Sequence, residues 1–264
     1  MNLNLKNKVA IITGSSSGLG KVIAQRLAES GAHVLICART QISLNSTISE
    51  FKKNGLSAGG AVVNVKDPAQ VKRFYKEQVS KLDILINNVG GVEKFGSFMD
   101  LEPQDWSDAL ALNLMSMVYF SQEAIPYMKK SGSGRIVNIS SVPAIQPGFF
   151  NPHYSAAKAA MVNLSKHLSN FLAKDNVLVN AVCPSTLSGG GWDRNINDKS
   201  SRLGITFDEA EKLMAVEEGK KVPLGRVGTV DDVANLVTFL CSEAANFITG
   251  ESISVDGGTT RSAF

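Results

Sequence analysis

The residues with the clearest chemical potential are Tyr154 and Lys158, four positions apart in the segment Asn-Pro-His-Tyr-Ser-Ala-Ala-Lys. Four residues make about one helical turn, so both side chains are expected on one helix face. A lysine ammonium beside a phenol favours the phenolate, and we therefore expect Lys158 to lower the pKa of Tyr154. Such a tyrosine could donate a proton to a carbonyl oxygen or accept one from an alcohol. The spacing alone is weak, because without further support a surface tyrosine packed on a lysine stem explains it better.

A serine hydroxyl is expected beside the same substrate oxygen. Ser140 and Ser141 end the segment Gly-Arg-Ile-Val-Asn-Ile-Ser-Ser, which reads as a strand followed by its polar end. Neighbouring strand residues point in opposite directions, so only one of the two can face Tyr154. The spacing to Tyr154 favours Ser141 over Ser140.

A glycine-rich turn near the N-terminus predicts a dinucleotide site. The apolar residues 9–12 suit a buried parallel strand, a helical pattern runs over 20–29, and a second strand is expected at 33–37. Strand, glycine turn, helix and strand in this order form a dinucleotide-binding fingerprint, here spaced Gly-x-x-x-Gly-x-Gly, although a purely structural turn would explain the glycines alone. The helix N-terminus would offer N–H groups to a pyrophosphate. The expected contacts come from Gly14, Ser16, Ser17, Gly18, Leu19 and Gly20.

The end of the second predicted strand favours NADP over NAD. An acid there would bind both ribose hydroxyls and repel a 2′-phosphate, but the chain reads Cys37-Ala38-Arg39-Thr40. Arg39 can meet that phosphate with a charge-assisted contact. The alternative is a solvated arginine that begins the next helix.

Taken together, these residues resemble the short-chain dehydrogenase/reductase family, in the shorter form to which 3-oxoacyl-[acyl-carrier-protein] reductase-like members belong. The resemblance covers nearly the whole chain. It rests on the glycine turn, on Tyr154 and Lys158, and on four further segments: Asn87-Asn88-Val89-Gly90, Leu112-Asn113-Leu114, Val179-Asn180-Ala181-Val182-Cys183-Pro184, and Ile253-Ser254-Val255-Asp256-Gly257-Gly258.

The resemblance implies roles for individual residues. The catalytic residues would be Asn113, Ser141, Tyr154 and Lys158, with Lys158 also bonding the nicotinamide ribose and Asn113 positioning a water. Cofactor contacts beyond the glycine turn and Arg39 would come from Asn64, Val65, Asn88, Gly90, Tyr154, Lys158, Pro184 and Ser188.

Three departures from the family pattern bear on these roles. Val89 replaces a usual alanine and Ser188 a frequent threonine, both mild exchanges. Ser185 follows Pro184 where glycine is usual, which questions the path of that loop, because serine does not readily adopt positive φ.

Length and composition predict one α/β domain over residues 1–264, a doubly wound parallel sheet (Rossmann fold) with helices on both faces. No apolar run is long enough to span a membrane, and the start lacks signal-peptide features. Three separated cysteines, Cys37, Cys183 and Cys241, read as buried reduced thiols, so a cytoplasmic location is expected.

Partners are expected to be small molecules. The net charge of +3 and the scattered basic doublets do not predict binding to nucleic acid or membranes, and the histidines lack metal-ligand spacing. His153 could touch a substrate, but a packing or solvent role explains it better. Family members often form tetramers, which implies a homotetramer.

The substrate is the least determined feature. Residues 185–222 correspond to a mobile substrate lid in the family, and a bulky, partly apolar substrate is expected, although each apolar residue could simply pack the lid against the body. The leading hypothesis is an NADP-dependent carbonyl reductase of 3-oxoacyl type; the alternatives are a dehydrogenase of a steroid, sugar or other secondary alcohol, and a cofactor-binding regulator without turnover. Candidate pocket residues are Trp192, Ile196, Leu203, Ile205, Phe207, Leu213 and Met214 in the lid, with Ile145, Phe149 and Phe150 after the Ser141 strand.

Overall fold

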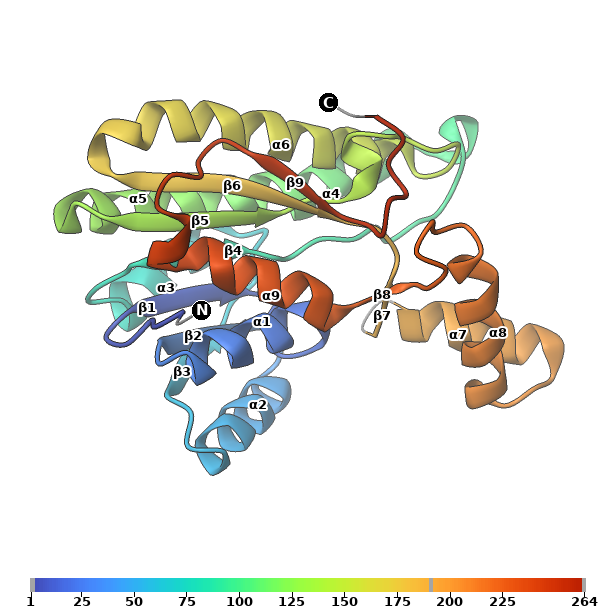
Figure 1. Cartoon of the computed structure of the whole chain (residues 1–264), viewed down its shortest axis with the longest axis horizontal. Coiled ribbons are helices and arrows are strands. Elements are labelled where there is room, and N and C mark those ends of the chain that lie inside the picture. The colour runs from blue at the N-terminus through green and yellow to red at the C-terminus, as the bar shows by residue number, and fades with distance from the viewer. Residues whose placement is uncertain (1–2, 190–191, 263–264) are drawn as a thin grey trace.

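Seven parallel strands pair into the central sheet of the computed structural model, which describes residues 3–189 and 192–262 (Figure 1). The strand order is β3-β2-β1-β4-β5-β6-β9, and every neighbouring pair is parallel. The central strands are continuous apolar runs because helices cover both of their faces. The strands are β1 (Val9–Thr13), β2 (His33–Ala38), β3 (Ala58–Val62), β4 (Ile84–Asn87), β5 (Gly134–Ile139), β6 (Val177–Pro184) and β9 (Ser252–Val255).

Helices form a layer on each face of this sheet, which confirms the predicted doubly wound fold (Figure 1). One face is covered by α1 (Gly18–Glu29), α2 (Gln41–Lys53) and α9 (Val230–Cys241). The other is covered by α3 (Pro68–Gln78), α5 (Ser116–Ser131) and α6 (Pro152–Leu172), with α4 (Pro103–Leu110) beside α6. Short 3-10 turns lie at Phe98–Asp100, Val142–Ala144, Ala173–Asp175 and Glu243–Ala245.

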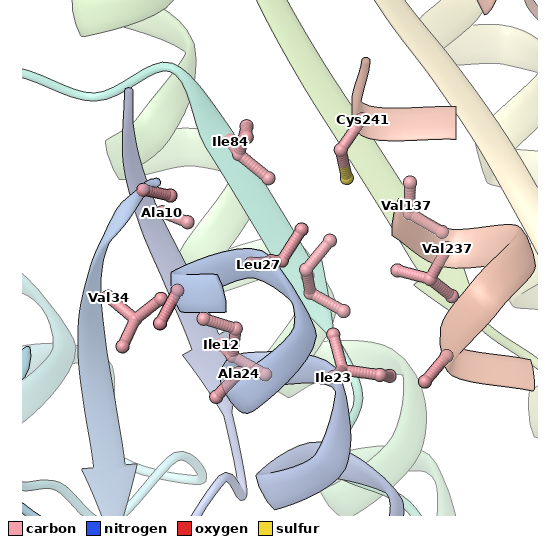
Figure 2. Packing of buried hydrophobic residues seen from close by; sticks show 14 of the residues in the cluster. Ala10, Ile12, Ile23, Ala24, Leu27, Val34, Ile84, Val137, Val237 and Cys241 are labelled. Carbon is pink, nitrogen blue, oxygen red and sulfur yellow. The ribbon is translucent and has the colours of Figure 1, made fainter. Parts of the chain in front are cut away.

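The core under α1 and α9 shows how the sequence pattern becomes packing (Figure 2). Ile12 and Ile84 come from adjacent strands and meet Ile23 and Leu27, which are spaced one turn apart on α1. Val237 of α9 closes the cluster from the C-terminal side. All of these side chains are fully buried, and burial of each large aliphatic side chain stabilises the fold by roughly 1.5–3 kcal/mol.

The strand order reverses between β1 and β4. Strands β2 and β3 lie on one side of β1, and β4 and the strands that follow it lie on the other side. In open parallel sheets the loops diverge at such a switch point and leave room for a ligand outside the carboxyl ends of the strands. Thr13, Asn87, Ile139 and Pro184 end β1, β4, β5 and β6 at this edge.

A helical hairpin projects beyond the same edge of the sheet (Figure 1). It consists of α7 (Trp192–Leu203) and α8 (Phe207–Gly219), and the two-stranded pair β7 (Leu187–Ser188) and β8 (Gly228–Thr229) joins its two ends. Residues 190 and 191 of the expected lid lie outside the described residues. Within the described ranges, no helix combines the length and the apolar character that crossing a membrane requires.

Candidate functional site

The turn after β1 is tied to the segment after β4 through Thr13 and Asn88. The Oγ1 atom of Thr13 accepts hydrogen bonds from the backbone N–H groups of Asn88 at 2.9 Å and Val89 at 3.0 Å. In return, the side-chain amide of Asn88 donates to the carbonyl oxygen of Thr13 at 2.9 Å. The loops on the two sides of the switch point are therefore fixed to each other.

Glycine is required at both ends of the turn between β1 and α1. Gly14 has a φ of +64°, which disfavours other residues. A Cβ atom at Gly20 would lie 2.5 Å from Nδ2 of Asn88 and would overlap the carbonyl group of Gly14. The backbone of Gly20 therefore lies closer to the backbone of Gly14 than a residue with a side chain would allow.

The remaining turn residues lead into the N-terminus of α1. Helix α1 begins at Gly18 with Leu19 in its first turn, and Ser16 and Ser17 precede it. The Ser17 side chain makes no capping hydrogen bond to the helix. Unpaired N–H groups and the positive end of the helix dipole suit a pyrophosphate at this position.

Arg39 and Asn64 follow β2 and β3 at the same edge of the sheet. The Arg39 side chain is exposed directly after β2. Asn64 is exposed and Val65 half-buried, and Oδ1 of Asn64 accepts the N–H of Lys66 at 3.1 Å. The second lone pair of that oxygen is left for another donor, such as an adenine amino group.

Helix α6 carries Tyr154 and Lys158 close together, as their spacing predicts. The Nζ atom of Lys158 lies 5.7 Å from the centroid of the Tyr154 ring. Ser141, directly after Ser140 at the end of β5, forms a hydrogen bond with Tyr154. Ser140 instead donates to the backbone carbonyl of Lys158 at 2.9 Å. The structure therefore brings Ser141, and not Ser140, to the phenol.

Lys158 is enclosed by backbone. Its side chain is only 2% exposed, and Nζ donates to the carbonyl oxygen of Ile139 at 2.8 Å. A Cβ atom at Gly90 would lie 2.6 Å from Nζ of Lys158 and 2.9 Å from Oδ1 of Asn113. Because Gly90 has no side chain, the polar groups of Lys158 and Asn113 can both pack against the backbone of the loop after β4.

The expected lowering of the Tyr154 pKa is wrong for the cofactor-free chain. Burial raises the pKa of Tyr154 above its ordinary value, and the hydrogen bond with Ser141 opposes this only in part. Burial also lowers the pKa of Lys158 to about 7, because removing the ammonium from water disfavours its charged form. Lys158 was expected to carry a full positive charge, because local sequence does not reveal how deeply a side chain is buried.

Asn113 lies in a single π-helical turn, Ala111–Met115, between α4 and α5. It is fully buried, and its amide donates to the carbonyl oxygens of Gly91 and Ala109, each at 2.8 Å. Its Oδ1 atom accepts the N–H of Gly91 at 3.0 Å. Interruptions of this kind in α-helices recur at functional sites, and here the turn anchors the loop after β4.

Ser185 and Ser188 both have defined conformations or contacts in the loop after β6. Ser185 does not adopt a positive φ, so serine is accommodated in place of the usual glycine without backbone strain. The hydroxyl of Ser188 donates to the carbonyl of Gly228 at 3.3 Å, within the β7–β8 pair. Ser188 therefore supports the base of the hairpin in this structure. Pro184 is buried at the end of β6, and its carbonyl oxygen lies 3.5 Å from Oγ of Ser141.

Apart from Ile145, which is half-buried after β5, the apolar residues expected to line a pocket divide into two groups. Trp192 and Ile196 are buried in a separate cluster with Ala210, against which Ile205 and Met214 pack. They form the internal core of the hairpin. The second group, which is exposed, consists of Leu203, Phe207, Leu213, Phe149 and Phe150.

Two supporting residues escaped the sequence reasoning. Ser15 is fully buried, and its Oγ donates to the carbonyl of Ile12 at 2.6 Å and accepts the N–H of Cys37 at 3.2 Å. Asn151 has a φ of +57°. Its backbone N–H donates to the carbonyl oxygen of Gly96 at 2.8 Å, and its Oδ1 atom accepts the N–H of Gly96 at 3.1 Å. The Asn-Pro pair at the start of α6 is a turn signal that could have indicated Asn151.

These features fit a nicotinamide dinucleotide. The site provides a glycine turn too tight for side chains, a helix N-terminus, an exposed arginine after β2, and a tyrosine and a lysine at the switch point. The described residues contain no group of three or more His, Cys, Asp or Glu side chains that could hold a metal ion. Fold and site together define an α/β dinucleotide-dependent oxidoreductase.

Comparison with known proteins identifies the family. Residues 8–200 match the short chain dehydrogenase family, and the chain belongs to the short-chain dehydrogenases/reductases, which are NAD(P)-dependent enzymes. It is 36% identical to a tropinone reductase homolog of Arabidopsis thaliana, over 99% of this chain and 92% of the relative. It is 34% identical to the 3-oxoacyl-[acyl-carrier-protein] reductase FabG of Aquifex aeolicus, over 98% and 99% of the two chains.

Solved structures of sugar-converting enzymes are also similar. L-sorbose reductase from Gluconobacter frateurii, complexed with NADPH and L-sorbose, superposes with a TM-score of 0.91 at 30% identity, covering 99% of this chain and 100% of that chain. A gluconate 5-dehydrogenase from Burkholderia cenocepacia, in complex with NADP and tartrate, gives a TM-score of 0.87 at 29% identity, covering 99% and 98%.

Proposed function

We propose that the protein is an NADP-dependent reductase that interconverts a ketone and a secondary alcohol. The observation that carries this proposal is the position of Tyr154, hydrogen-bonded to Ser141 and next to the buried Lys158 at the carboxyl edge of the sheet.

In the proposed carbonyl reduction, each side chain of the site has a separate role. Tyr154 donates the proton to the carbonyl oxygen, and Ser141 hydrogen-bonds the same oxygen where negative charge develops. The bound cofactor supplies the hydride for the carbonyl carbon. The raised pKa of Tyr154 keeps its phenol protonated near neutral pH, in the form that donates. Lys158, with a pKa of about 7, can gain and lose a proton at that pH and so restore the phenol.

The geometry supports a binding role for each of the following residues. The turn Gly14–Gly20 and the N-terminus of α1 would hold the pyrophosphate, and Tyr154 and Lys158 the nicotinamide ribose. Arg39 would bind the 2′-phosphate and so select NADP. The NADPH and NADP complexes of similar enzymes support this choice. We further propose that Asn113 positions a water that links Lys158 to solvent.

Two substrate classes follow from different observations. The exposed Phe149 and Phe150 after β5 favour a 3-oxoacyl or other partly apolar ketone, as does the similarity to FabG. The similarity to L-sorbose reductase favours a sugar ketone. Under either reading we propose that residues 185–222, with the α7–α8 hairpin, form the substrate lid.

We also propose that residues 1–264 act as one catalytic domain, as a homotetramer in the cytoplasm. Buried, unpaired thiols at Cys37, Cys183 and Cys241 support a reducing compartment. Sedimentation at micromolar concentration tests the assembly, and a single monomeric species would overturn it.

The deciding experiment compares wild-type protein with Tyr154→Phe. NADPH and NADH binding would be measured by fluorescence, and turnover by loss of reduced-nicotinamide absorbance with acyl, cyclic and sugar ketones. We expect tight NADPH binding by both proteins, and turnover of one ketone class that falls about 10²–10⁴-fold in the variant. Preferred binding of NADH would overturn the role of Arg39. NADPH binding without turnover on any ketone would favour the regulator hypothesis.

A further inference from the structure

A chain of buried polar side chains connects β4 and β5 to helix α6. Asn87, the last residue of β4, is paired with Asn138 in the register of the sheet, and its Nδ2 atom donates to Oδ1 of Asn138 at 2.8 Å. The Nδ2 atom of Asn138 donates in turn to Oγ of Ser165 on α6, also at 2.8 Å. The three side chains are at most 3% exposed. Hydrogen bonds between side chains therefore run from the sheet to the helix inside the core.

Stability alone does not explain polar residues at these positions. Ile136 precedes Asn138 by two residues, so it points to the same face of the sheet, and it packs in the apolar core under α5 and α6. The Oδ1 atom of Asn87 is buried and has no hydrogen-bond partner among the described residues. Apolar side chains of similar shape would avoid the cost of that unpaired oxygen. Hydrogen bonds differ from apolar contacts in fixing direction and distance, and this property explains the polar chain.

The elements that this chain connects carry the proposed catalytic groups. Ser141 follows Asn138 by only three residues. On α6, Tyr154 and Lys158 precede Ser165 by about three and two helical turns. Lys158 and Ser165 therefore lie on the same face of the helix, the face turned toward β5.

Helix α6 is thus attached to β5 at two points. At the first, Nζ of Lys158 donates to the carbonyl oxygen of Ile139, and Ser140 donates to the carbonyl oxygen of Lys158. The second point is the bond between Asn138 and Ser165, roughly 10 Å further along the helix. Lys158 takes part in the proposed proton exchange and ribose binding, so its own hydrogen bonds change during turnover. The second point holds no group that titrates near neutral pH, so it holds α6 whatever the state of Lys158.

We infer that Asn138 and Ser165 are positioning residues, whose hydrogen bond fixes α6 on β5 and so sets the distance between the Ser141 hydroxyl and the Tyr154 phenol. The kinetic part of this inference rests on the proposed reductase function. The position of the helix does not, because it depends only on the contacts between α6 and the sheet.

Two serines on α6 provide a matched pair of substitutions. Ser165→Ala removes the acceptor of the Asn138 amide, which is then buried without a partner. Ser169→Ala is the control, because Ser169 is equally buried, at 2% exposed, and its hydroxyl donates to the carbonyl oxygen of Lys166 within the same helix. The two variants lose the same atom, but only the first loses a bond to the sheet.

A double variant separates the position of the helix from the stability of the fold. We expect Ser165→Ala to lower Tm by about 2–10 °C, because it leaves the Asn138 amide unpaired. Adding Asn138→Leu replaces that amide by an apolar group of similar shape, and the missing Oγ of Ser165 leaves room for it. The double variant should therefore recover most of the loss in Tm, although the bond between the strand and the helix is still absent.

Catalysis should not recover with stability. We expect kcat at saturating NADPH and ketone to fall about tenfold in Ser165→Ala and to stay as low in the double variant. The stoichiometry of NADPH binding should stay unchanged, which shows that the loss does not come from unfolded molecules. Ser169→Ala should keep the wild-type kcat. A merely structural role would make kcat recover together with Tm, and that result, or a wild-type kcat in Ser165→Ala, overturns the inference.

Crystal structures of the wild-type protein and of Ser165→Ala give a readout that does not depend on turnover. We expect the distance between Oγ of Ser141 and the phenol oxygen of Tyr154 to increase by about 0.5 Å or more in the variant. An unchanged distance, or a wild-type structure without the bond between Asn138 and Ser165, overturns the inference. If no ketone is turned over, so that the proposed function fails, or if the double variant does not recover its Tm, this distance decides.

Discussion

At the scale of single residues, burial decides which groups of the site carry charge. Tyr154 and Lys158 were expected to form a phenol with an ammonium beside it, yet both lie in surroundings that disfavour their charged forms. The folded chain therefore presents a protonated phenol and a lysine that titrates near pH 7. Both properties suit proton transfer to a carbonyl oxygen at neutral pH.

The buried Lys158 predicts an unusual dependence of stability on pH. Its pKa is about 7 in the folded chain against an ordinary value of 10.5, so between these values the unfolded chain binds more protons. The free energy of unfolding should therefore rise with pH above 7, by at most about 1.4 kcal/mol per pH unit from this group. Urea unfolding of wild-type protein and Lys158→Met between about pH 7 and 9.5 isolates the effect, because other titrating groups are shared. Parallel curves for the two proteins would contradict this expectation.

At the scale of elements, the turn between β1 and α1 depends on the absence of a side chain at Gly20. In Gly20→Ala the new methyl group meets Asn88 and the Gly14 carbonyl, so the turn must open and lose its fit to a pyrophosphate. We expect at least about a tenfold loss of NADPH affinity, measured by fluorescence titration, since about 1.4 kcal/mol corresponds to tenfold. Gly148→Ala is the control, because a Cβ atom there has no atom within 4 Å. Equal affinities for the two variants would show that the turn tolerates the methyl group.

The hairpin of α7 and α8 has a core of its own, which makes it separable from the sheet. Ile196 is fully buried in that core, and its truncation to alanine should cost about 2–5 kcal/mol locally. We expect Ile196→Ala to raise the KM for the ketone several-fold and to speed proteolysis within 192–219, while NADPH affinity stays unchanged. Leu203→Ala, at a half-exposed position of the same helix, should behave like wild type. A fall in NADPH affinity would instead show that the hairpin supports the cofactor site.

The elements also show where sequence reasoning succeeds and where it stops. Buried strands and amphipathic helices follow from apolar periodicity, so β1, α1 and β2 could be predicted, as could the shared face of Tyr154 and Lys158. Local patterns carry no information on distant partners. They could not reveal that Trp192 packs within the hairpin, or that Ser188 bonds Gly228, because both depend on how α7, α8 and β8 meet.

At the scale of the whole molecule, the proposed cofactor site joins the two halves of the sheet. Arg39 and the glycine turn follow β2 and β1, whereas Tyr154 and Lys158 follow β5 across the switch point. A ligand that contacts both halves only when the chain is folded stabilises the entire fold, in proportion to the logarithm of its concentration over its Kd.

Thermal denaturation with each cofactor should therefore report the role of Arg39. At about 100 times its Kd, NADPH should add roughly 2.7 kcal/mol, which raises Tm by about 5–10 °C for a chain of this size. The charge-assisted contact of Arg39 with the 2′-phosphate is worth about 1.5–3 kcal/mol, so Arg39→Ser should lose most of this shift at the same NADPH concentration. The smaller shift with NADH should not change, because NADH lacks that phosphate. Equal losses with both cofactors would mean that Arg39 stabilises the turn itself and does not select NADP.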